Sequence, residues 1–148
     1  MREIERHDMA ATPALSIIIV EDQDSLGRLM ALCLRQAGFA VETIADGRAA
    51  LELLARDVLP ALIIVDYLLP YANGLRVTRA LRDHPSWQTV PIICVTGTTH
   101  EDTMIQGLRL HSDGFLSVPF QPEELVALAR RLTAAGDQAR GALPAPVP

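Results

Sequence analysis

Acidic and hydroxyl side chains follow three short apolar runs of this sequence. Glu21 and Asp22 come directly after one run, and Asp66 follows a second. Thr96 ends a third. If these runs are neighbouring parallel strands, their carboxyl ends meet at one edge of a sheet and the three carboxylates converge. Anions a few ångströms apart repel by roughly 4 kcal/mol per pair at an effective dielectric near 20. Such a group needs shared protons or a cation, and an all-oxygen site suits Mg²⁺.

The elements that must position these residues are short strands alternating with helices. The apolar runs are too short for helices and are apolar on both faces, which favours buried parallel strands. The predicted strands cover residues 16–20, 39–43, 61–65, 90–95 and 115–118. Apolar residues three and four apart predict helices from Asp24 or Ser25 to Gly38, and over 49–56, 75–81, 100–109 and 122–132. Five strands alternating with five helices predict an open α/β sheet covered on both sides.

The 148 residues divide into three predicted zones. Residues 1–13 are predicted to form a flexible leader, and residues 14–135 carry the periodic structure of one domain. Residues 136–148 hold two Gly and three of the ten Pro, with almost no bulky apolar side chains. Such a segment buries too little apolar surface to order itself, so it is predicted to be a disordered tail.

Composition argues against several classes of protein. The formal net charge of −5 and the pI near 5.3 disfavour direct binding to nucleic acid. No apolar run reaches the ~18 residues of a membrane helix, and the charged N-terminus is no signal peptide, so a cytoplasmic location is expected. Cys33 and Cys94 lie far apart in apolar runs, which favours buried thiols over a zinc site.

All thirteen basic residues are Arg, and the chain contains no Lys. This composition excludes a Schiff-base lysine, a phosphate-loop lysine and any other mechanism that needs an ε-ammonium group.

Several segments stand together in an order and spacing that is highly specific as a set. They are IIVED at 18–22, LIIVDYLLP at 62–70, Gly74, PIICVTG at 91–97, DGFL at 113–116 and PF at 119–120. By these segments the chain resembles the receiver domain of bacterial two-component response regulators, over about residues 15–135. The resemblance implies a flavodoxin-like, doubly wound five-stranded parallel sheet with strand order 2-1-3-4-5 and five helices.

The resemblance also implies a role for each acidic residue. Asp66 would be the phosphoryl acceptor. Glu21 and Asp22 would hold Mg²⁺ together with Asp66, and the carbonyl oxygen of Tyr67 would be a further ligand. The side chain of Tyr67 is expected at the mouth of this pocket. Mg²⁺ would neutralise charge between the two anionic reactants and fix an in-line approach.

The switch and the partners follow from the same resemblance. Thr96 would hydrogen-bond a phosphoryl oxygen, and Phe115 would be the aromatic residue that moves inward when Thr96 shifts. The expected donor is a sensor histidine kinase or a histidine phosphotransfer protein, and the expected output is contact with a downstream protein. A weak homodimer is possible by resemblance alone. The domain would not be an enzyme, although it would assist its own phosphorylation and dephosphorylation.

One position departs from the family. The family has a Lys just before the Pro that follows the fifth strand, and this chain has Val118 there. Ser117 is expected to point to the opposite face of the strand, and it offers only a neutral hydroxyl. We therefore expect strong dependence on a divalent metal, one acid with a raised pKa in the metal-free protein, and weaker coupling of phosphorylation to the output face.

Three alternatives stay open from the sequence. Val118 favours a pseudo-receiver, a phosphorylation-independent interaction module with the same fold. A metal-dependent hydrolase with Asp66 as nucleophile would need an acid or base two residues later, where Leu68 stands. A nucleotide-binding module would need a glycine-rich turn after the first strand, which the sequence lacks.

Overall fold

The computed structural model describes residues 13–67, 74–97 and 111–142, with side chains up to Ala134. Its strands are β1 (Ser16–Val20), β2 (Ala40–Ile44), β3 (Leu62–Asp66), β4 (Ile92–Thr96) and β5 (Gly114–Ser117). Its helices are α2 (Asp24–Gln36), α3 (Gly47–Glu52), α4 (Gly74–Asp83) and α6 (Pro122–Ala142), with a 3₁₀ turn η1 (Leu53–Ala55). The helix predicted over 100–109 and all but the last residue of the predicted leader lie outside the described residues.

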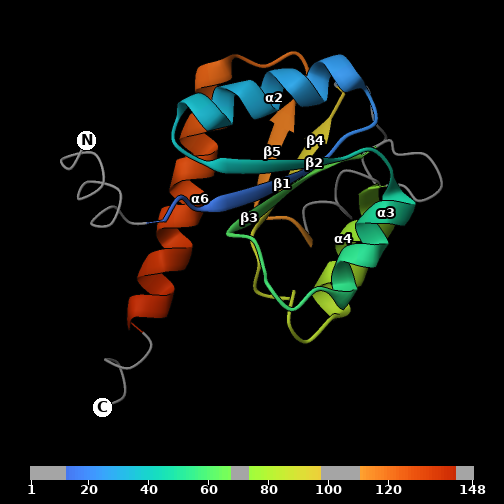
Figure 1. Cartoon of the computed structure of the whole chain (residues 1–148), viewed down its shortest axis with the longest axis vertical. Helices are drawn as coiled ribbons and strands as arrows, with labels where there is room; N and C mark the ends of the chain where they lie inside the picture. Colours follow the sequence, from blue (N-terminus) through green and yellow to red (C-terminus); the bar gives the residue numbers. More distant parts are fainter. Residues whose placement is uncertain (1–12, 68–73, 98–110, 143–148) are drawn as a thin grey trace, which may run out of the picture.

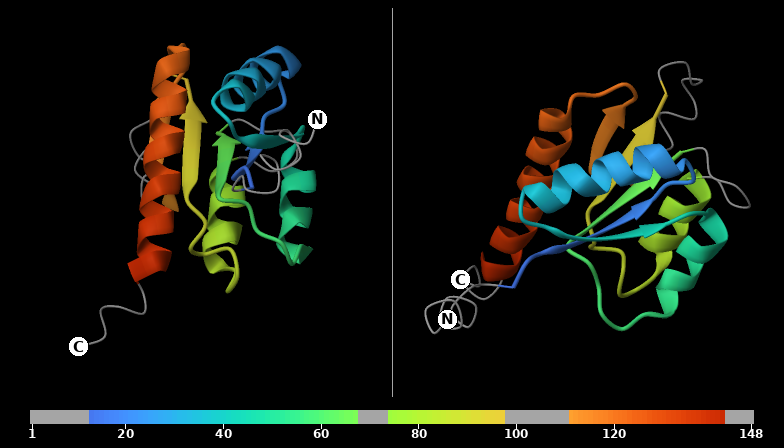
Figure 2. Two further views of the ribbon diagram at one scale, coloured as in Figure 1. Left: turned by 60° about the vertical axis from the view of Figure 1, so that its left-hand side comes forward. Right: turned by 45° about the horizontal axis from the view of Figure 1, so that its top comes forward.

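The strands form one parallel sheet in the order β2-β1-β3-β4-β5. Helices α2 and α6 cover one face of the sheet, and α3 and α4 cover the other (Figure 1). The two further views in Figure 2 show the same three layers. This architecture confirms the predicted fold class and strand order. In a sheet of this kind all five carboxyl ends lie along one edge, which is where the acidic residues were expected.

Burial along the strands follows their place in the sheet. The central strands β1, β3 and β4 are buried along almost their whole length. In the edge strand β2 only Ile44 is buried, which explains the weak pattern of this strand in the sequence. Buried parallel strands are apolar on both faces, so their runs are the clearest signal in the sequence.

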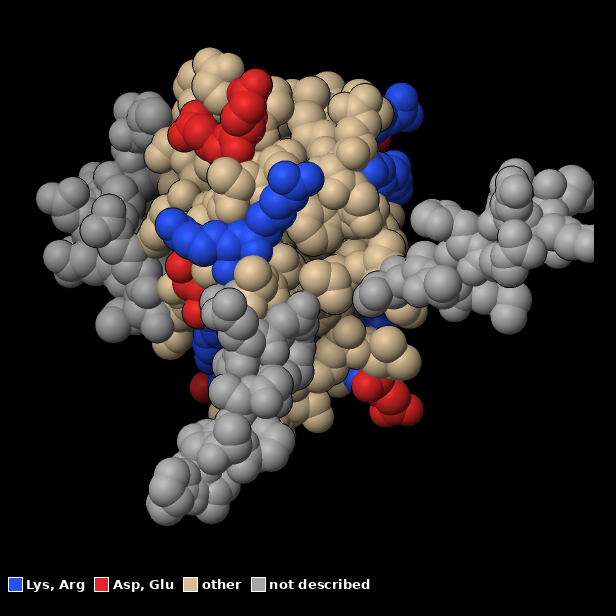
Figure 3. Space-filling view, turned by 90° about the vertical axis from the view of Figure 1, so that its left-hand side faces the viewer, with Lys and Arg blue, Asp and Glu red and all other residues tan. Residues whose placement is uncertain are grey.

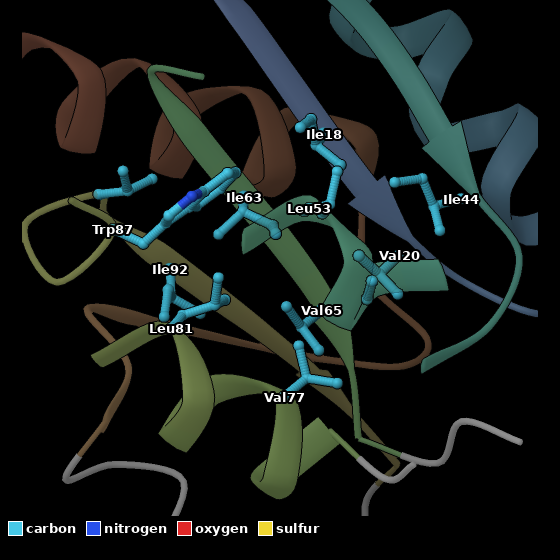
Figure 4. Close-up of a cluster of buried hydrophobic side chains, with 12 residues drawn as sticks. Ile18, Val20, Ile44, Leu53, Ile63, Val65, Val77, Leu81, Trp87 and Ile92 are labelled. Atoms are coloured by element: carbon cyan, nitrogen blue, oxygen red, sulfur yellow. The ribbon is translucent and has the colours of Figure 1, made fainter. Parts of the chain in front are cut away.

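Two apolar cores fill the layers on either side of the sheet. One core lies between the sheet and α3 and α4, and Figure 4 shows Trp87, Leu81 and Ile63 packed within it. Trp87 is fully buried in this core. The other core lies beneath α2 and α6 and includes Met30 and Leu34. Leu29, next to Met30 in α2, is 46% exposed.

Two helix boundaries differ from the prediction. Gln23 occupies the N-cap position of α2 without a side-chain cap, and Asp24 lies in the first turn, where it pairs with Arg28. At the other end of the chain, α6 continues to Ala142, past residue 132, where the predicted helix ended, and past residue 135, where the predicted domain ended. The three Pro that suggested a tail all lie beyond Ala142, and the two Gly within the helix each cost only about 1 kcal/mol relative to Ala. None of the described helices is both long and apolar enough to cross a bilayer.

Candidate functional site

The carboxylates of Glu21, Asp22 and Asp66 meet at the carboxyl edge of the sheet. Strands β1 and β3 pair in parallel with Val20 opposite Val65, so the residues that follow them emerge side by side. Ligand oxygens of the three acids lie within 4.8 Å of one another. The convergence predicted from the strand ends is therefore present.

Glu21 is the buried member of this group, with 5% of its surface exposed. Its Oε2 accepts a hydrogen bond from the backbone N–H of Gln23 at 3.1 Å, while its buried Oε1 has no hydrogen-bond partner. Burial, and next the neighbouring Asp66 carboxyl, raise the pKa of Glu21 to about 8. This confirms the expected acid of raised pKa, although burial contributes more than repulsion between the carboxylates.

The donor set fits Mg²⁺. Three carboxylates supply oxygen ligands, and the unpartnered Oε1 of Glu21 is a buried acceptor that a cation or a proton would satisfy. Asp22 is exposed at the same place, which leaves one side of the group open to solvent. The residues that could hold the ion are Glu21, Asp22 and Asp66, together with the carbonyl oxygen of Tyr67.

The backbone of Tyr67 is fixed on both sides. Its N–H donates to the carbonyl of Val95 at 2.8 Å, and its own carbonyl accepts from the N–H of Gly74 at 2.6 Å. A carbonyl oxygen has two lone pairs, so accepting one hydrogen bond does not prevent it from acting as a metal ligand. The tyrosine side chain is only 3% exposed and packs on Cys94 with Leu75 against it. Its expected place at the pocket mouth is therefore wrong, because the first turn of α4 covers it.

Thr96 and Phe115 lie on adjacent strands behind the acidic group. Phe115 pairs in register with Cys94, and Thr96 pairs with Ser117. Thr96 is buried, and its hydroxyl donates to the carbonyl of Gly97 at 3.1 Å. Phe115 is half-buried against Tyr67 and Cys94. The two residues expected to form a switch are thus one strand apart, and Phe115 belongs to the same apolar cluster as Tyr67.

The side chain of Val118 points into the layer between the sheet and helices α2 and α6. It is half-buried and packs against the core beneath α2 and α6, and its N–H donates to the carbonyl of Thr96 at 2.9 Å. The peptide bond between Val118 and Pro119 is cis. Ser117 is exposed, as the alternation along the strand predicts. Neither side chain supplies a cation to the carboxylates.

Some contributions to this region were not predicted. The N–H groups of Gln23 and Gly74 orient Glu21 and Tyr67, and a backbone donor leaves no side-chain signal in a sequence. Arg82 is half-buried in α4, and it donates to the carbonyls of residues 88, 90 and 111 and pairs with the carboxylate of residue 113. The carboxylate that pairs with Arg82 is that of Asp113, and its place in the DGFL segment was the only signal in the sequence for this pair.

Comparisons with known proteins agree with this geometry. The family model of the response regulator receiver domain matches residues 17–130. The alkaline phosphatase synthesis transcriptional regulatory protein SphR of Synechococcus elongatus is 38% identical over 131 residues, which are 83% of this chain and 50% of SphR. The chain spans about half the length of the curated relatives it matches.

Solved structures show the same fold. A response regulator from Chloroflexus aurantiacus aligns with a TM-score of 0.76 and 32% identity, over 82% of this chain and 99% of that one. The receiver domain of sensor histidine kinase PA1611 from Pseudomonas aeruginosa, which holds a magnesium ion in its active-site cleft, aligns with a TM-score of 0.75 and 27% identity, over 82% and 99%. By its family match, its relatives and its fold, this chain belongs to the response regulator receiver domains.

Proposed function

We propose that Asp66 of this chain accepts a phosphoryl group with the help of Mg²⁺. The observation that carries the proposal is the group formed by Glu21, Asp22 and Asp66, whose ligand oxygens lie within 4.8 Å of one another and include a buried, unpartnered oxygen of Glu21. If these acids served only the fold, their carboxylates would be expected to lie apart from one another and in contact with solvent. A buried acid beside two others instead suits an ion that arrives from outside.

The proposed reaction is a phosphoryl transfer from a phosphohistidine. An oxygen of the Asp66 carboxylate bonds to phosphorus as the nitrogen–phosphorus bond of the donor breaks, and the departing imidazole nitrogen keeps the electron pair. Bound Mg²⁺, held by Glu21, Asp22, Asp66 and the carbonyl of Tyr67, would neutralise charge between the two anions. The chain itself fixes the direction of approach, because β1 and β3 hold the carboxylates at one edge of the sheet.

The proposed response runs through Thr96 and Phe115. The hydroxyl of Thr96 now donates to the carbonyl of Gly97, and a phosphoryl oxygen on Asp66 would be a stronger, charged acceptor. A shift of Thr96 toward that acceptor would open space beside Phe115, which is only half-buried and packs on Tyr67 and Cys94. The phosphoryl group would thereby change the surface around β5.

The proposed donor is a sensor histidine kinase or a histidine phosphotransfer protein, and the proposed output is contact with another protein in the cytoplasm. SphR is by name a transcriptional regulatory protein, and the present chain spans half of its length. The acidic net charge of −5 supports a protein target for this domain over nucleic acid.

Intact mass spectrometry tests the proposal. The chain is incubated with acetyl phosphate with and without Mg²⁺, and we expect a mass gain of about 80 Da that requires the metal. Peptide mapping should place the adduct on Asp66, and the Asp66→Asn variant should show none. An adduct that persists in Asp66→Asn, or that forms equally well in EDTA, would contradict the proposed acceptor or the proposed role of the metal.

Val118 favours a second candidate, a pseudo-receiver that signals by contact without phosphorylation. Its side chain packs into the apolar core and brings no cation to the acidic group. The same experiment separates the two functions. If no adduct forms and the phosphoryl mimic beryllofluoride changes neither tyrosine fluorescence nor Phe115 resonances, the pseudo-receiver stands and phosphoryl acceptance is withdrawn.

A further inference from the structure

An open groove of about 360 Å³ runs between α2 and α6. Val126 and Ala127 line it from α6, and the half-buried Cys33 lines it from α2. Its polar lining residues are Gln36, Glu123 and Arg130. A mostly apolar lining with a few polar groups, in a volume of about 300–1,000 Å³, is typical of sites that bind small molecules. We call it the α2–α6 groove.

The polar residues give this groove an acidic end and a basic end. Glu123 lies in the first turn of α6, and Arg130 lies seven residues later. Seven residues make almost two helical turns, so the two side chains leave nearly the same face of α6, about 10 Å apart along its axis. The guanidinium of Arg130 reaches the end of α2, where it donates to the carbonyl of Ala37 at 3.4 Å. Opposite charges therefore lie at the two ends of one apolar hollow.

Figure 3 looks onto the side of the molecule along which α6 runs. Acidic side chains gather near one end of this face, and basic side chains lie below them toward the middle. Glu123 and Arg130 are both exposed, and no ion pair within the described residues involves either of them. Charged side chains on one helix pair when they are three or four residues apart, so a spacing of seven keeps these two from satisfying each other.

Each polar group of the groove keeps donors or acceptors for an external partner. The side chains of Gln36 and Glu123 make no hydrogen bond in the part of the chain that the structure describes. Arg130 uses one of its guanidinium donors, in the long contact to Ala37. One bound molecule that carries both a cation and an anion would satisfy both ends of the groove.

The dimensions and the charges of the groove describe that molecule. An extended peptide spans about 3.4 Å per residue, so three residues cover the distance of about 10 Å between the positions of Glu123 and Arg130. A free peptide at neutral pH carries an ammonium group at one end and a carboxylate at the other. The apolar lining between the two charges, formed by Val126, Ala127 and Cys33, suits an aliphatic side chain. A terminus of a protein chain would bring only one of the two charges, so the pattern favours a free peptide.

We propose that the α2–α6 groove binds a free peptide of about three residues, with its ammonium group on Glu123, its carboxylate on Arg130 and an aliphatic side chain against the apolar lining. A guanidinium group can hold a carboxylate through two parallel N–H···O bonds, which fixes the direction in which the peptide lies. None of the residues that line the groove belongs to the acidic group at the sheet edge. The proposal therefore goes beyond phosphoryl acceptance and stands or falls separately from it.

Alkylation of Cys33 measures whether the groove is occupied. Cys33 is half-buried in the lining, whereas Cys94 is fully buried and burial raises the pKa of its thiol to about 12, so iodoacetamide should react with Cys33 alone. We expect the tripeptide Ala-Leu-Ala to slow this reaction, as followed by mass spectrometry. The same peptide with an acetylated N-terminus and an amidated C-terminus should bind about tenfold more weakly, because it lacks both charged contacts. Absence of protection, or equal protection by the free and the blocked peptide, overturns the proposal.

Single substitutions separate the two charged contacts. Glu123→Gln should bind the free and the N-acetylated peptide equally while it still prefers the free carboxylate over the amide, and Arg130→Gln should show the reverse. The matched controls are Glu124→Gln and Arg131→Gln, which make the same changes of charge one residue further along, beside the groove between β5 and α6. Both controls should discriminate between the peptides as the unchanged chain does. A control that loses discrimination as fully as its neighbour would point to the overall charge of α6 and would overturn the proposal.

Nuclear magnetic resonance locates the bound peptide. In a titration with Ala-Leu-Ala, amide resonances of α2 and of the first turns of α6 should shift, and those of the residues that follow β1 and β3 should not. The titration needs neither Mg²⁺ nor a phosphoryl donor, so a failure of Asp66 to accept phosphate would leave its result unchanged. Circular dichroism of each variant checks that the helices are intact. Shifts confined to the acidic edge, or spread evenly over the protein, would overturn the assignment to this groove.

Discussion

Gly74 donates its backbone N–H to the carbonyl oxygen of Tyr67 at 2.6 Å, and this contact sets how closely α4 approaches the acidic group. A Cβ at Gly74 would lie 2.5 Å from the carbonyl oxygen of Asp66 and 2.7 Å from the Cα of Tyr67. Both atoms belong to the backbone, so neither can swing aside. Glycine is required here for space, because the start of a helix packs directly on the end of the strand that carries Asp66.

Replacing Gly74 with alanine should therefore disturb the acidic site through the backbone of Asp66 and Tyr67. We expect Gly74→Ala to destabilise the fold by about 1–3 kcal/mol, as overpacking does, and to reduce Mg²⁺ binding by displacing Asp66 and the Tyr67 carbonyl. Urea unfolding and calorimetric titration with Mg²⁺ measure the two effects. Gly27→Ala is the matched control, since its Cβ would meet Glu21 at an ordinary 3.7 Å. That variant should gain up to about 1 kcal/mol from helix propensity.

The raised pKa of Glu21 predicts a stability that falls with pH in the metal-free protein. Its carboxyl has a pKa of about 8 in the fold against 4.5 as the ordinary value, so the unfolded chain releases this proton more readily. Raising the pH from about 5 to about 8 therefore favours the unfolded state. Unfolding in EDTA across this range should show the decline, and Glu21→Gln should reduce it.

Glu42 offers a control because its pKa is shifted in the opposite direction to that of Glu21. Its hydrogen bond to Arg56 lowers the pKa of Glu42, so any stability from that pair is lost only as the pH falls below the ordinary carboxyl range. Glu42→Gln should leave the decline above pH 5 unchanged. Mg²⁺ competes with the proton on Glu21, so Mg²⁺ binding should tighten as the pH rises. If the Glu21→Gln variant still loses stability as the pH rises, that loss belongs to another titrating group.

Restoring the family's lysine should strengthen phosphorylation. In Val118→Lys the long stem can follow the apolar surface that Val118 now covers and carry an ammonium group toward Asp66. A charge-assisted contact is worth about 1.5–3 kcal/mol, so the phosphorylated fraction with acetyl phosphate should rise about ten- to a hundredfold when donor is limiting. Val118→Met provides the uncharged control. No gain over that control would mean that the missing cation does not limit the reaction.

Arg82 and Asp113 join the end of α4 to the starts of β4 and β5. The Arg82 guanidinium donates to two backbone carbonyls on the approach to β4 and to the carbonyl of His111, and Asp113 accepts from the N–H of Ile92 at 2.8 Å. Removing the half-buried Arg82 guanidinium leaves three backbone carbonyls without their donor and the exposed Asp113 carboxylate without its partner. We expect Arg82→Ala to cost about 2–4 kcal/mol in urea unfolding.

A matched surface pair shows what the burial of Arg82 contributes. Arg56 pairs with Glu42 by two hydrogen bonds, but its side chain is 45% exposed against 19% for Arg82. Arg56→Ala should therefore cost at most about 1 kcal/mol. Arg82→Lys should recover little of the loss, because an ammonium group cannot reproduce the planar fork of a guanidinium. Equal costs for Arg82→Ala and Arg56→Ala would refute this account.

The elements and the acidic group could be predicted because both depend on local pattern. Short apolar runs mark buried parallel strands, and residues such as Asp66 that end those strands must share one edge whatever packs around them. The identity of the fold needed no side-chain detail, and neither did the meeting of Glu21 with Asp66. Helix ends were less certain, as at Ala142, because single Gly residues reduce helix stability without ending the helix.

What only the tertiary structure decided is the surroundings of each side chain. Trp87 in the core, Tyr67 beneath the first turn of α4 and Arg82 among backbone carbonyls all depend on segments distant in sequence. No periodicity encodes such contacts, because they arise when layers pack in three dimensions. The sequence by itself determined which residues gather at the sheet edge and that no lysine can join them. Packing determined that Glu21 is the acid withdrawn from water, and so which acid has the raised pKa.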